Sequence, residues 1–253
     1  MPEDSVLVFS GLDPSGGAGI SADIETINQF GVTALPIVTT LTVQNTESVI
    51  DLQEVESDFI TDQFNHLIED ISFSVVKVGL LSSERQIDTI HTLLSKCKDA
   101  TVVLDPIVRS SAGRELLNEK AVESLKLKLL PLVSVLTPNL GELKALCPNM
   151  DELDAVRSLP CEWLLLTTSD ASEIEIEHRL YRNAKLIDRF NYKKLPGSYH
   201  GSGCTLASAV SALLSLGVNT DIACKSALKY TYQTLLNAKS IGKMQYHPNR
   251  QKP

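Results

Sequence analysis

The sequence predicts a doubly wound α/β fold, in which a mostly parallel sheet is covered by helices on both faces. Short apolar runs alternate with longer amphipathic stretches along most of the chain, which is typical of this class. Polar residues follow the predicted strands at the point where each strand ends. No internal repeat, low-complexity tract or linker interrupts the pattern. We therefore expect residues 1–253 to form one domain.

The apolar runs and the amphipathic stretches give the order of the expected elements. Buried strands are predicted for residues 5–9, 35–41, 75–78, 101–104, 133–136 and 163–166. Amphipathic helices are predicted for residues 20–30, 57–71, 83–96, 118–130, 204–216 and 221–239. Gly31 is expected to end the first helix, because glycine adopts the left-handed conformation of a C-cap. Residues 173–189 lose the helical period and predict a hairpin at the sheet edge.

Composition and charge exclude several classes of protein. A net charge of −8 argues against a nucleic-acid partner, because phosphate backbones attract basic surfaces. The five cysteines form no Cys-x-x-Cys pair, which argues against a zinc site. No signal-peptide pattern is found, and no apolar run approaches the roughly 20 residues of a membrane span. We expect a cytoplasmic protein with no membrane contact.

The turn Gly201-Ser202-Gly203-Cys204 opens an apolar helix near the end of the chain. Glycines let successive backbone N–H groups point into one concavity, and the helix dipole adds positive potential there. Such a turn can stabilise a phosphoryl group during transfer, and the first turn of a helix lowers the pKa of a thiol, which suits Cys204 as a base. The alternative is a glycine loop entering a buried helix, with Cys204 packed inside.

A second glycine-rich segment, residues 11–19, follows the first predicted strand. It contains Asp13, Ala18 and Gly19, and Asp23 comes shortly after it. The segment has neither the Walker spacing nor Gly-x-Gly-x-x-Gly, so a P-loop nucleotide site is not predicted. It allows the backbone to approach a small ligand closely. A simple tight turn between a strand and a helix explains the same residues.

Several polar residues are expected to meet at one edge of the sheet. Asp13, Gly79, Asp105, Asn139 and Thr167 each lie at or just beyond the carboxyl end of a predicted strand, where open parallel sheets bind ligands. Glu142 follows Asn139 by three residues, and Glu142 together with Asp105 could position magnesium, although most Asn-x-x-Glu matches are helix caps. The amide of Gln44, after another strand, can donate to and accept from a heteroaromatic ring, unless it lies in an exposed loop.

Taken together and in this order, these segments resemble the hydroxymethylpyrimidine/phosphomethylpyrimidine kinases of thiamine biosynthesis, in the ribokinase-like superfamily. The resemblance spans most of the chain. The segments that carry it are residues 11–23, 39–45, 77–81, 104–107, 136–142 and 200–206. Most ribokinase-like sugar kinases carry Asp where this chain has Cys204. The family implies a three-layer α/β/α sandwich with a mostly parallel central sheet.

The resemblance also implies a reaction and a set of site residues. The reaction is ATP-dependent phosphorylation of 4-amino-5-hydroxymethyl-2-methylpyrimidine, and then of its monophosphate, with Mg²⁺ as cofactor. Cys204 is expected to be catalytic, with Gly201, Ser202 and Gly203 as the anion hole. The remaining roles are substrate binding for Asp13, Ala18, Gly19, Asp23, Gln44, Leu80 and Ile107, ATP binding for Asn139 and Thr167, and metal binding for Asp105 and Glu142.

One departure from the family pattern keeps other functions open. Family members usually carry a Lys-Gly-Gly-His-like stretch after the strand that here ends near residue 166, and its lysine approaches ATP. This chain has Thr167-Thr168-Ser169-Asp170 instead. A pyrimidine-binding sensor with weakened catalysis is therefore one alternative. A pyridoxal or pyridoxine kinase is another, because the superfamily's pocket tolerates related ring alcohols. A homodimer is expected, as is common among relatives.

Overall fold

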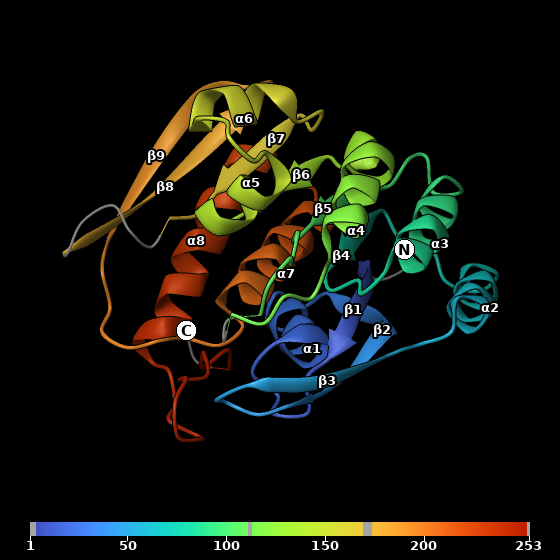
Figure 1. The fold of residues 1–253 in the computed structure, drawn as a ribbon, viewed down its shortest axis with the longest axis horizontal. Coiled ribbons are helices and arrows are strands. Elements are labelled where there is room, and N and C mark those ends of the chain that lie inside the picture. Colours follow the sequence, from blue (N-terminus) through green and yellow to red (C-terminus); the bar gives the residue numbers. More distant parts are fainter. Residues whose placement is uncertain (1–3, 111–112, 169–173, 252–253) are drawn as a thin grey trace.

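The computed structural model describes residues 4–110, 113–168 and 174–251. Its strands form one nine-stranded sheet in the order β3-β2-β1-β4-β5-β6-β7-β8-β9 (Figure 1). The strands are β1 (Ser5–Leu12), β2 (Thr33–Gln44), β3 (Val49–Glu54), β4 (Val75–Val78), β5 (Thr101–Leu104), β6 (Val135–Leu136), β7 (Trp163–Leu166), β8 (Glu175–Arg182) and β9 (Lys185–Lys193).

The sheet is mostly parallel, as the sequence predicts. Six neighbouring strands run parallel, namely β2, β1, β4, β5, β6 and β7. Strand β3 at one edge and strands β8 and β9 at the other are antiparallel. The edge hairpin predicted for residues 173–189 is confirmed by β8 and β9, whose turn places Asn183 and Ala184 at positive φ. Strand β3 was not predicted. Only Val49 of its six residues is buried, so it lacks an apolar signal.

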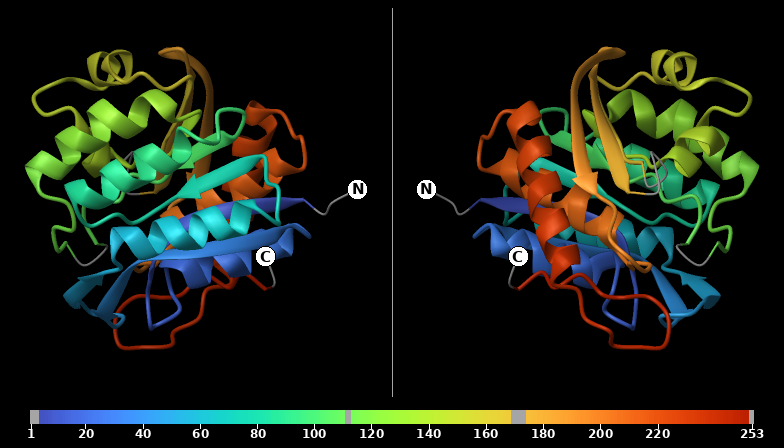
Figure 2. Two further views of the ribbon diagram at one scale, coloured as in Figure 1. Left: turned by 90° about the vertical axis from the view of Figure 1, so that its right-hand side faces the viewer. Right: turned by 90° about the vertical axis from the view of Figure 1, so that its left-hand side faces the viewer.

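Helices cover both faces of the sheet and complete three layers (Figures 1 and 2). On one face lie α2 (Ser57–Ile68), α3 (Glu84–Leu94), α4 (Glu119–Ser124), α5 (Leu140–Leu146) and α6 (Glu152–Ser158). On the other lie α1 (Gly19–Gln29), α7 (Ser202–Ser215) and α8 (Thr220–Leu236). The predicted three-layer sandwich is confirmed. Within the described ranges, no helix has both the length and the apolar character that crossing a bilayer requires.

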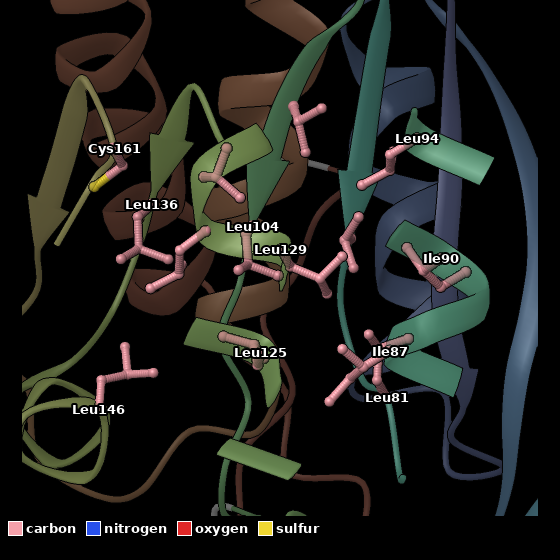
Figure 3. Packing of buried hydrophobic residues seen from close by; sticks show 14 of the residues in the cluster. Leu81, Ile87, Ile90, Leu94, Leu104, Leu125, Leu129, Leu136, Leu146 and Cys161 are labelled. Carbon is pink, nitrogen blue, oxygen red and sulfur yellow. The ribbon is translucent and has the colours of Figure 1, made fainter. Parts of the chain in front are cut away.

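Alternating side chains on the central strands divide the interior into two cores. On β1, Leu7 and Phe9 join the core beneath α2 to α6, whereas Val6 and Val8 face α1, α7 and α8. This is the period of two expected of strands buried on both faces. Figure 3 shows part of the larger core, where Leu104 of β5 packs among side chains such as Leu129.

The helices differ from the prediction mainly in the middle of the chain. The helix predicted for residues 118–130 begins as expected after Asn118, but α4 ends at Ser124 and continues as a π-helical stretch, Leu125–Leu129, and a 3₁₀ turn, Leu130–Leu132. Pro131 cannot donate a helical hydrogen bond, which accounts for the change in winding. Helices α5 and α6 were not predicted, because each has only seven residues and shows too little periodicity.

Candidate active site

A cavity of about 400 Å³ opens where the carboxyl ends of the parallel strands meet the start of α1, α5 and α7. It is the place where an open parallel sheet is expected to bind a ligand. Thirteen of the fifteen predicted site residues line it: Asp13, Ala18, Gly19, Gln44, Leu80, Asp105, Ile107, Asn139, Glu142, Gly201, Ser202, Gly203 and Cys204. Asp23 and Thr167 do not.

The glycine turn before α7 closely contacts the loop after β1. Gly201 has φ of 83°, and a Cβ at this residue would lie only 2.0 Å from the carbonyl oxygen of Gly17. Only glycine fits both requirements. No side chain caps α7, and its first turn contains no acidic residue. The first amides of a helix have no intrahelical acceptor, so this end of α7 offers N–H groups and positive potential to an anion in the cavity.

The Cys204 thiol carries its proton near neutral pH. Burial raises its pKa to about 12, although the nearby Lys77 ammonium acts in the opposite direction. The expectation that this pKa is lowered is therefore wrong. Cys204 is only 5% exposed, and its burial together with the Asp105 and Asp23 charges outweighs the effect of Lys77.

The carboxylate of Asp105 has an unsatisfied oxygen within the site. Asp105 is buried, and its Oδ2 has no hydrogen-bond partner among the described residues. Burial raises the pKa of this carboxyl group, and Asp23 adds to the increase, whereas Lys77 and Cys204 reduce it. A buried oxygen without a donor is well suited to a cation. The predicted metal role of Asp105 therefore agrees with its surroundings.

Asn139 and Glu142 form a capping box at the start of α5. The Asn139 side chain accepts a hydrogen bond from the Glu142 amide at 2.9 Å, and Glu142 Oε2 accepts from the Asn139 amide at 2.8 Å. The helix cap weighed as an alternative to a metal site is thus present. Both residues still line the cavity, and burial together with the Asp105 charge raises the pKa of Glu142. Capping and a role at the site are compatible.

The donor set at this edge fits a hard cation that keeps several waters. Within the part of the chain that the structure describes, no group of three or more His, Cys, Asp or Glu side chains could hold a metal ion. Mg²⁺ is usually bound by one or two carboxylates together with waters and substrate phosphates. Asp105, with its unsatisfied oxygen, and Glu142 supply that number of protein ligands.

Asp13 organises the loop that follows β1. Its carboxylate accepts hydrogen bonds from the Ser15 amide at 2.8 Å, the Ala18 amide at 2.8 Å and the Ser15 hydroxyl at 2.9 Å. His200 Nε2 lies 2.8 Å from Asp13 Oδ2. Burial raises the pKa of Asp13, but the hydrogen bonds from His200 and Ser15 outweigh it and bring the pKa below its ordinary value. Asp13 is therefore ionised and holds the loop in place.

The same imidazole nitrogen contacts Gln44, which constrains the orientation of the amide. Gln44 Nε2 lies 2.8 Å from His200 Nε2. Because the ionised Asp13 accepts a hydrogen bond from His200 Nε2–H, this nitrogen cannot also accept a hydrogen bond from Gln44. The two ends of an amide are interchangeable in shape, and the hydrogen-bond network decides between them. We assign Gln44 Oε1 to the side facing His200, which directs the amide N–H groups to the cavity.

Asp23 lies beside the site and does not line it. Its carboxylate is fully buried, pairs with Lys77 Nζ at 2.9 Å and accepts a hydrogen bond from Ser208 at 2.6 Å. The Asp23 carboxylate is thus already occupied by protein groups. Thr167 is also outside the cavity wall and forms an isolated bridge with Asn139. Ser169 and Asp170, of the segment that replaces the family lysine, fall outside the described residues.

Three structural residues around the site were given no role from the sequence. Lys77, which belongs to the segment 77–81 that carries the family resemblance, is buried in β4. His247 and Arg250, which follow α8, lie against Gly17. Arg250 donates to the Gly17 carbonyl, and its Nε donates to the Thr205 hydroxyl at 2.8 Å. The Gly17 contact spans 233 positions in sequence, so no local pattern could reveal it.

Comparison with known proteins identifies one family over almost the whole chain. A family model described as phosphomethylpyrimidine kinase matches residues 13–249. A hydroxymethylpyrimidine/phosphomethylpyrimidine kinase of Aquifex aeolicus is 31% identical over 246 residues, covering 94% of this chain and 96% of the relative. The Escherichia coli protein of the same name is 30% identical, with 95% and 94% of the two chains covered. A thiamine biosynthesis bifunctional protein of Geobacter sulfurreducens is 31% identical, and the match covers 51% of its length.

Solved structures agree with the fold. The structure resembles an ADP complex of Bacillus subtilis pyridoxal kinase with a TM-score of 0.89 at 23% identity, covering 99% and 98% of the two chains. It also resembles a phosphomethylpyrimidine kinase of Clostridium difficile with a TM-score of 0.77 at 28% identity, covering 92% and 100%. The first likeness concerns the fold alone. Together they confirm the ribokinase-like sandwich expected from the sequence.

Proposed function

The chain belongs to the phosphomethylpyrimidine kinase family, and from this premise we propose its substrates and the roles of its site residues. It is a kinase of the thiamine biosynthetic type. Its proposed acceptors are 4-amino-5-hydroxymethyl-2-methylpyrimidine and the corresponding monophosphate, with ATP as phosphoryl donor. Structural neighbours solved with ADP and with AMP-PCP support the use of ATP.

One arrangement carries the proposal. The amide end of α7, the Cys204 thiol and the unsatisfied Asp105 carboxylate all line the same cavity. Phosphoryl transfer needs an anion site, a position for the attacking hydroxyl group and a cation ligand within reach of one another. This combination supports a catalytic role for the glycine turn, because a packing role for Cys204 requires none of the other features.

The proposed chemistry is an in-line displacement. A hydroxyl oxygen of the alcohol, or a phosphate oxygen of the monophosphate, attacks the γ-phosphorus of ATP. The bond from this phosphorus to the β-bridging oxygen breaks, and ADP leaves with the electron pair. The α7 amides stabilise the negative charge on the transferring group. Cys204, as a thiolate, accepts the proton of the attacking hydroxyl group. Because the pKa of the Cys204 thiol is raised, little thiolate is present near neutral pH, and the rate of proton transfer should increase with pH.

Asp105 and Glu142 are the residues that would hold Mg²⁺. The ion, when bound, neutralises charge on the phosphate oxygens. Asp105 contributes an oxygen that lacks a donor in the free protein, and Glu142 is fixed by the capping box. Mutual repulsion between these carboxylates contributes to the raised pKa of Glu142, and a cation between them would relieve it.

Gln44 is proposed to recognise the pyrimidine ring. Its amide N–H groups face the cavity once His200 and Asp13 fix its orientation, and a ring nitrogen of the pyrimidine can accept from them. Replacing Gln44 with Leu should raise the KM for the pyrimidine about 10-fold or more, since a buried acceptor loses its donor. The KM for ATP should stay unchanged. An equal rise in both KM values would contradict this role.

Product identification by mass spectrometry tests the reaction. The purified protein is incubated with Mg²⁺ and ATP and, separately, with the pyrimidine alcohol, its monophosphate and pyridoxal. We expect a monophosphate from the first substrate and a diphosphate from the second. Pyridoxal phosphate alone would identify a pyridoxal kinase, and binding of the pyrimidine without any product would identify a sensor. The homodimer and the cytoplasmic location stay predictions, and light scattering tests the first.

A further inference from the structure

Arg109 is the one lysine or arginine among the described residues that line the cavity. It lies in the loop after β5 and is exposed. The same cavity is lined by three acidic side chains, Asp13, Asp105 and Glu142. The two internal segments outside the described ranges, 111–112 and 169–173, contain no lysine or arginine in the sequence. They therefore add no second cationic side chain to the site.

The loop that carries Arg109 is held in place by other residues. Its two sides are joined by a bridge between Arg109 and Glu115 and by hydrogen bonds from the Leu116 and Leu117 amides to the Val108 carbonyl. Arg114 anchors it to the strand β3, where its guanidinium donates to the Val49 carbonyl at 3.0 Å. The backbone of Arg109 is thus held in place by its pairing with Glu115, and Arg114 anchors the loop to β3.

The guanidinium of Arg109, unlike that of Arg114, does not anchor the loop. Among the residues that the structure describes, it makes no hydrogen bond or ion pair, whereas Arg114 and Arg250 are both engaged with backbone carbonyls. A guanidinium presents five donors in a planar fork that matches phosphate oxygens. An unengaged fork at the wall of an otherwise acidic cavity has the chemistry of an anion ligand.

We propose that Arg109 is the phosphate-binding side chain of this site. This inference rests on the proposed function, since the site would hold phosphorylated ligands in both of its reactions. A phosphate group that enters the cavity meets three acidic residues, and among the described lining residues Arg109 alone is a lysine or arginine, while the α7 amides add partial positive charge. A full positive charge at Arg109 offsets this repulsion.

Two phosphorylated ligands share this chemistry, and a binding experiment separates them. Isothermal titration calorimetry measures the affinity of the pyrimidine alcohol, the pyrimidine monophosphate and AMP-PCP for the wild type and for Arg109→Ala. Loss of affinity for the monophosphate alone assigns Arg109 to the acceptor substrate. Loss for AMP-PCP alone assigns it to the nucleotide. We expect at least one loss of about 10- to 100-fold, the range of a charge-assisted hydrogen bond, and a change of less than about twofold for the neutral alcohol.

Two further variants make the result specific. Arg109→Lys keeps the charge without the fork and should restore part of the affinity. Arg85→Ala removes an exposed arginine on α3 and should leave all three affinities unchanged. The inference is overturned if Arg109→Ala binds both phosphorylated ligands like the wild type, or if it loses the neutral alcohol equally.

The same titrations distinguish this inference from the proposed function. If the wild type binds AMP-PCP but neither pyrimidine, the proposed substrates are wrong, and the AMP-PCP result alone decides the role of Arg109. If the wild type binds no phosphorylated ligand at all, the inference fails as well. Kinetics with both pyrimidines supply a second readout, because a phosphate contact changes KM for the ligand concerned more than it changes the KM for its co-substrate.

Discussion

Lys77 and Asp23 form a fully buried ion pair next to the catalytic turn. Both side chains are 0% exposed, with 2.9 Å between Lys77 Nζ and Asp23 Oδ1. Asp23 is further satisfied by the Ser208 hydroxyl group of α7. The Lys77 charge also reaches Cys204 and Asp105, where it lowers both pKa values against the effect of burial. The pair therefore links the stability of the protein to the electrostatics of its site.

Replacing Lys77 with Met should destabilise the protein by about 3–5 kcal/mol, because Asp23 is left as an unpaired buried charge. Urea denaturation measures the change. The double variant Lys77→Met with Asp23→Leu should recover part of the loss, since it removes both charges together. A single variant as stable as the wild type would show that the pair is solvated, contrary to the burial described above.

Gly201 should not tolerate a side chain. Alanine would adopt a positive φ with difficulty and would place its Cβ 2.0 Å from the Gly17 carbonyl oxygen, so the turn or the loop after β1 must shift. We expect Gly201→Ala to lower kcat at least about 100-fold, because the anion site loses its geometry. Gly217→Ala is the matched control, with φ of 75° and open space around it. Equal activity losses in both variants would contradict the account.

At the level of elements, residues 239–250, which follow α8, form hydrogen bonds that hold the loops of the site in place. The His200 amide donates to the Tyr246 carbonyl at 2.9 Å, and the Lys239 and His247 backbones pair with each other. Arg250, which is 2% exposed, joins the Gly17 carbonyl of one loop to the Thr205 hydroxyl of α7. One terminal segment thus holds together the two turns that form the anion site.

Replacing Arg250 with Ala should lower both stability and turnover. Two site elements lose their shared donor, and we expect a loss of about 2–4 kcal/mol in the free energy of unfolding. The value of kcat should fall more than KM rises, since the residue positions the anion site and does not line the cavity. The exposed Lys229 on α8 gives a control variant, Lys229→Ala, with neither effect. Unchanged kcat in Arg250→Ala would refute the fastening role.

The sequence predicted the buried strands and the edge hairpin of β8 and β9, but it missed the edge strand β3. Residues 75–78, 101–104 and 163–166 are strands with the predicted bounds, because strands covered on both faces are short and mostly apolar. The exposed strand β3 escaped prediction for the opposite reason, since five of its six residues are not buried. Sheet geometry also explains why thirteen predicted site residues gather at one cavity, because parallel strands end at the same edge.

The features of the site that the sequence did not predict depend on contacts between segments far apart in the chain. The pKa of Cys204 is set by burial beneath α1 and the sheet, and it rises where the local helix terminus alone would lower it. The contact between Asp13 and His200 spans 187 positions, and that between Lys77 and Asp23 spans 54. The capping role of Glu142 is local, and the sequence offered it as an alternative without deciding.

At the scale of the whole molecule, one sheet connects all the strands of the described structure. We propose that the chain is a single domain and unfolds in one cooperative transition. Trp163, the only tryptophan, lies in β7 on the side of the sheet away from β1 and β2. Its fluorescence and the far-UV circular dichroism should therefore change at the same urea concentration. Two separate midpoints would indicate independent domains.

The carboxyl ends of the strands in this sheet bring the site residues together. The pH dependence of turnover tests whether Cys204 is the catalytic base. Because burial raises the thiol pKa to about 12, the thiolate fraction grows about tenfold per pH unit below that value. For the wild type, kcat/KM for the pyrimidine alcohol should rise with a slope near one between about pH 7 and 9. Cys204→Asp, whose carboxyl group loses its proton at a lower pH than the thiol, should show a shallower profile, and Cys204→Ala should lose about 100- to 10,000-fold in kcat. A flat wild-type profile, or a Cys204→Ala variant with normal turnover, would contradict the assignment.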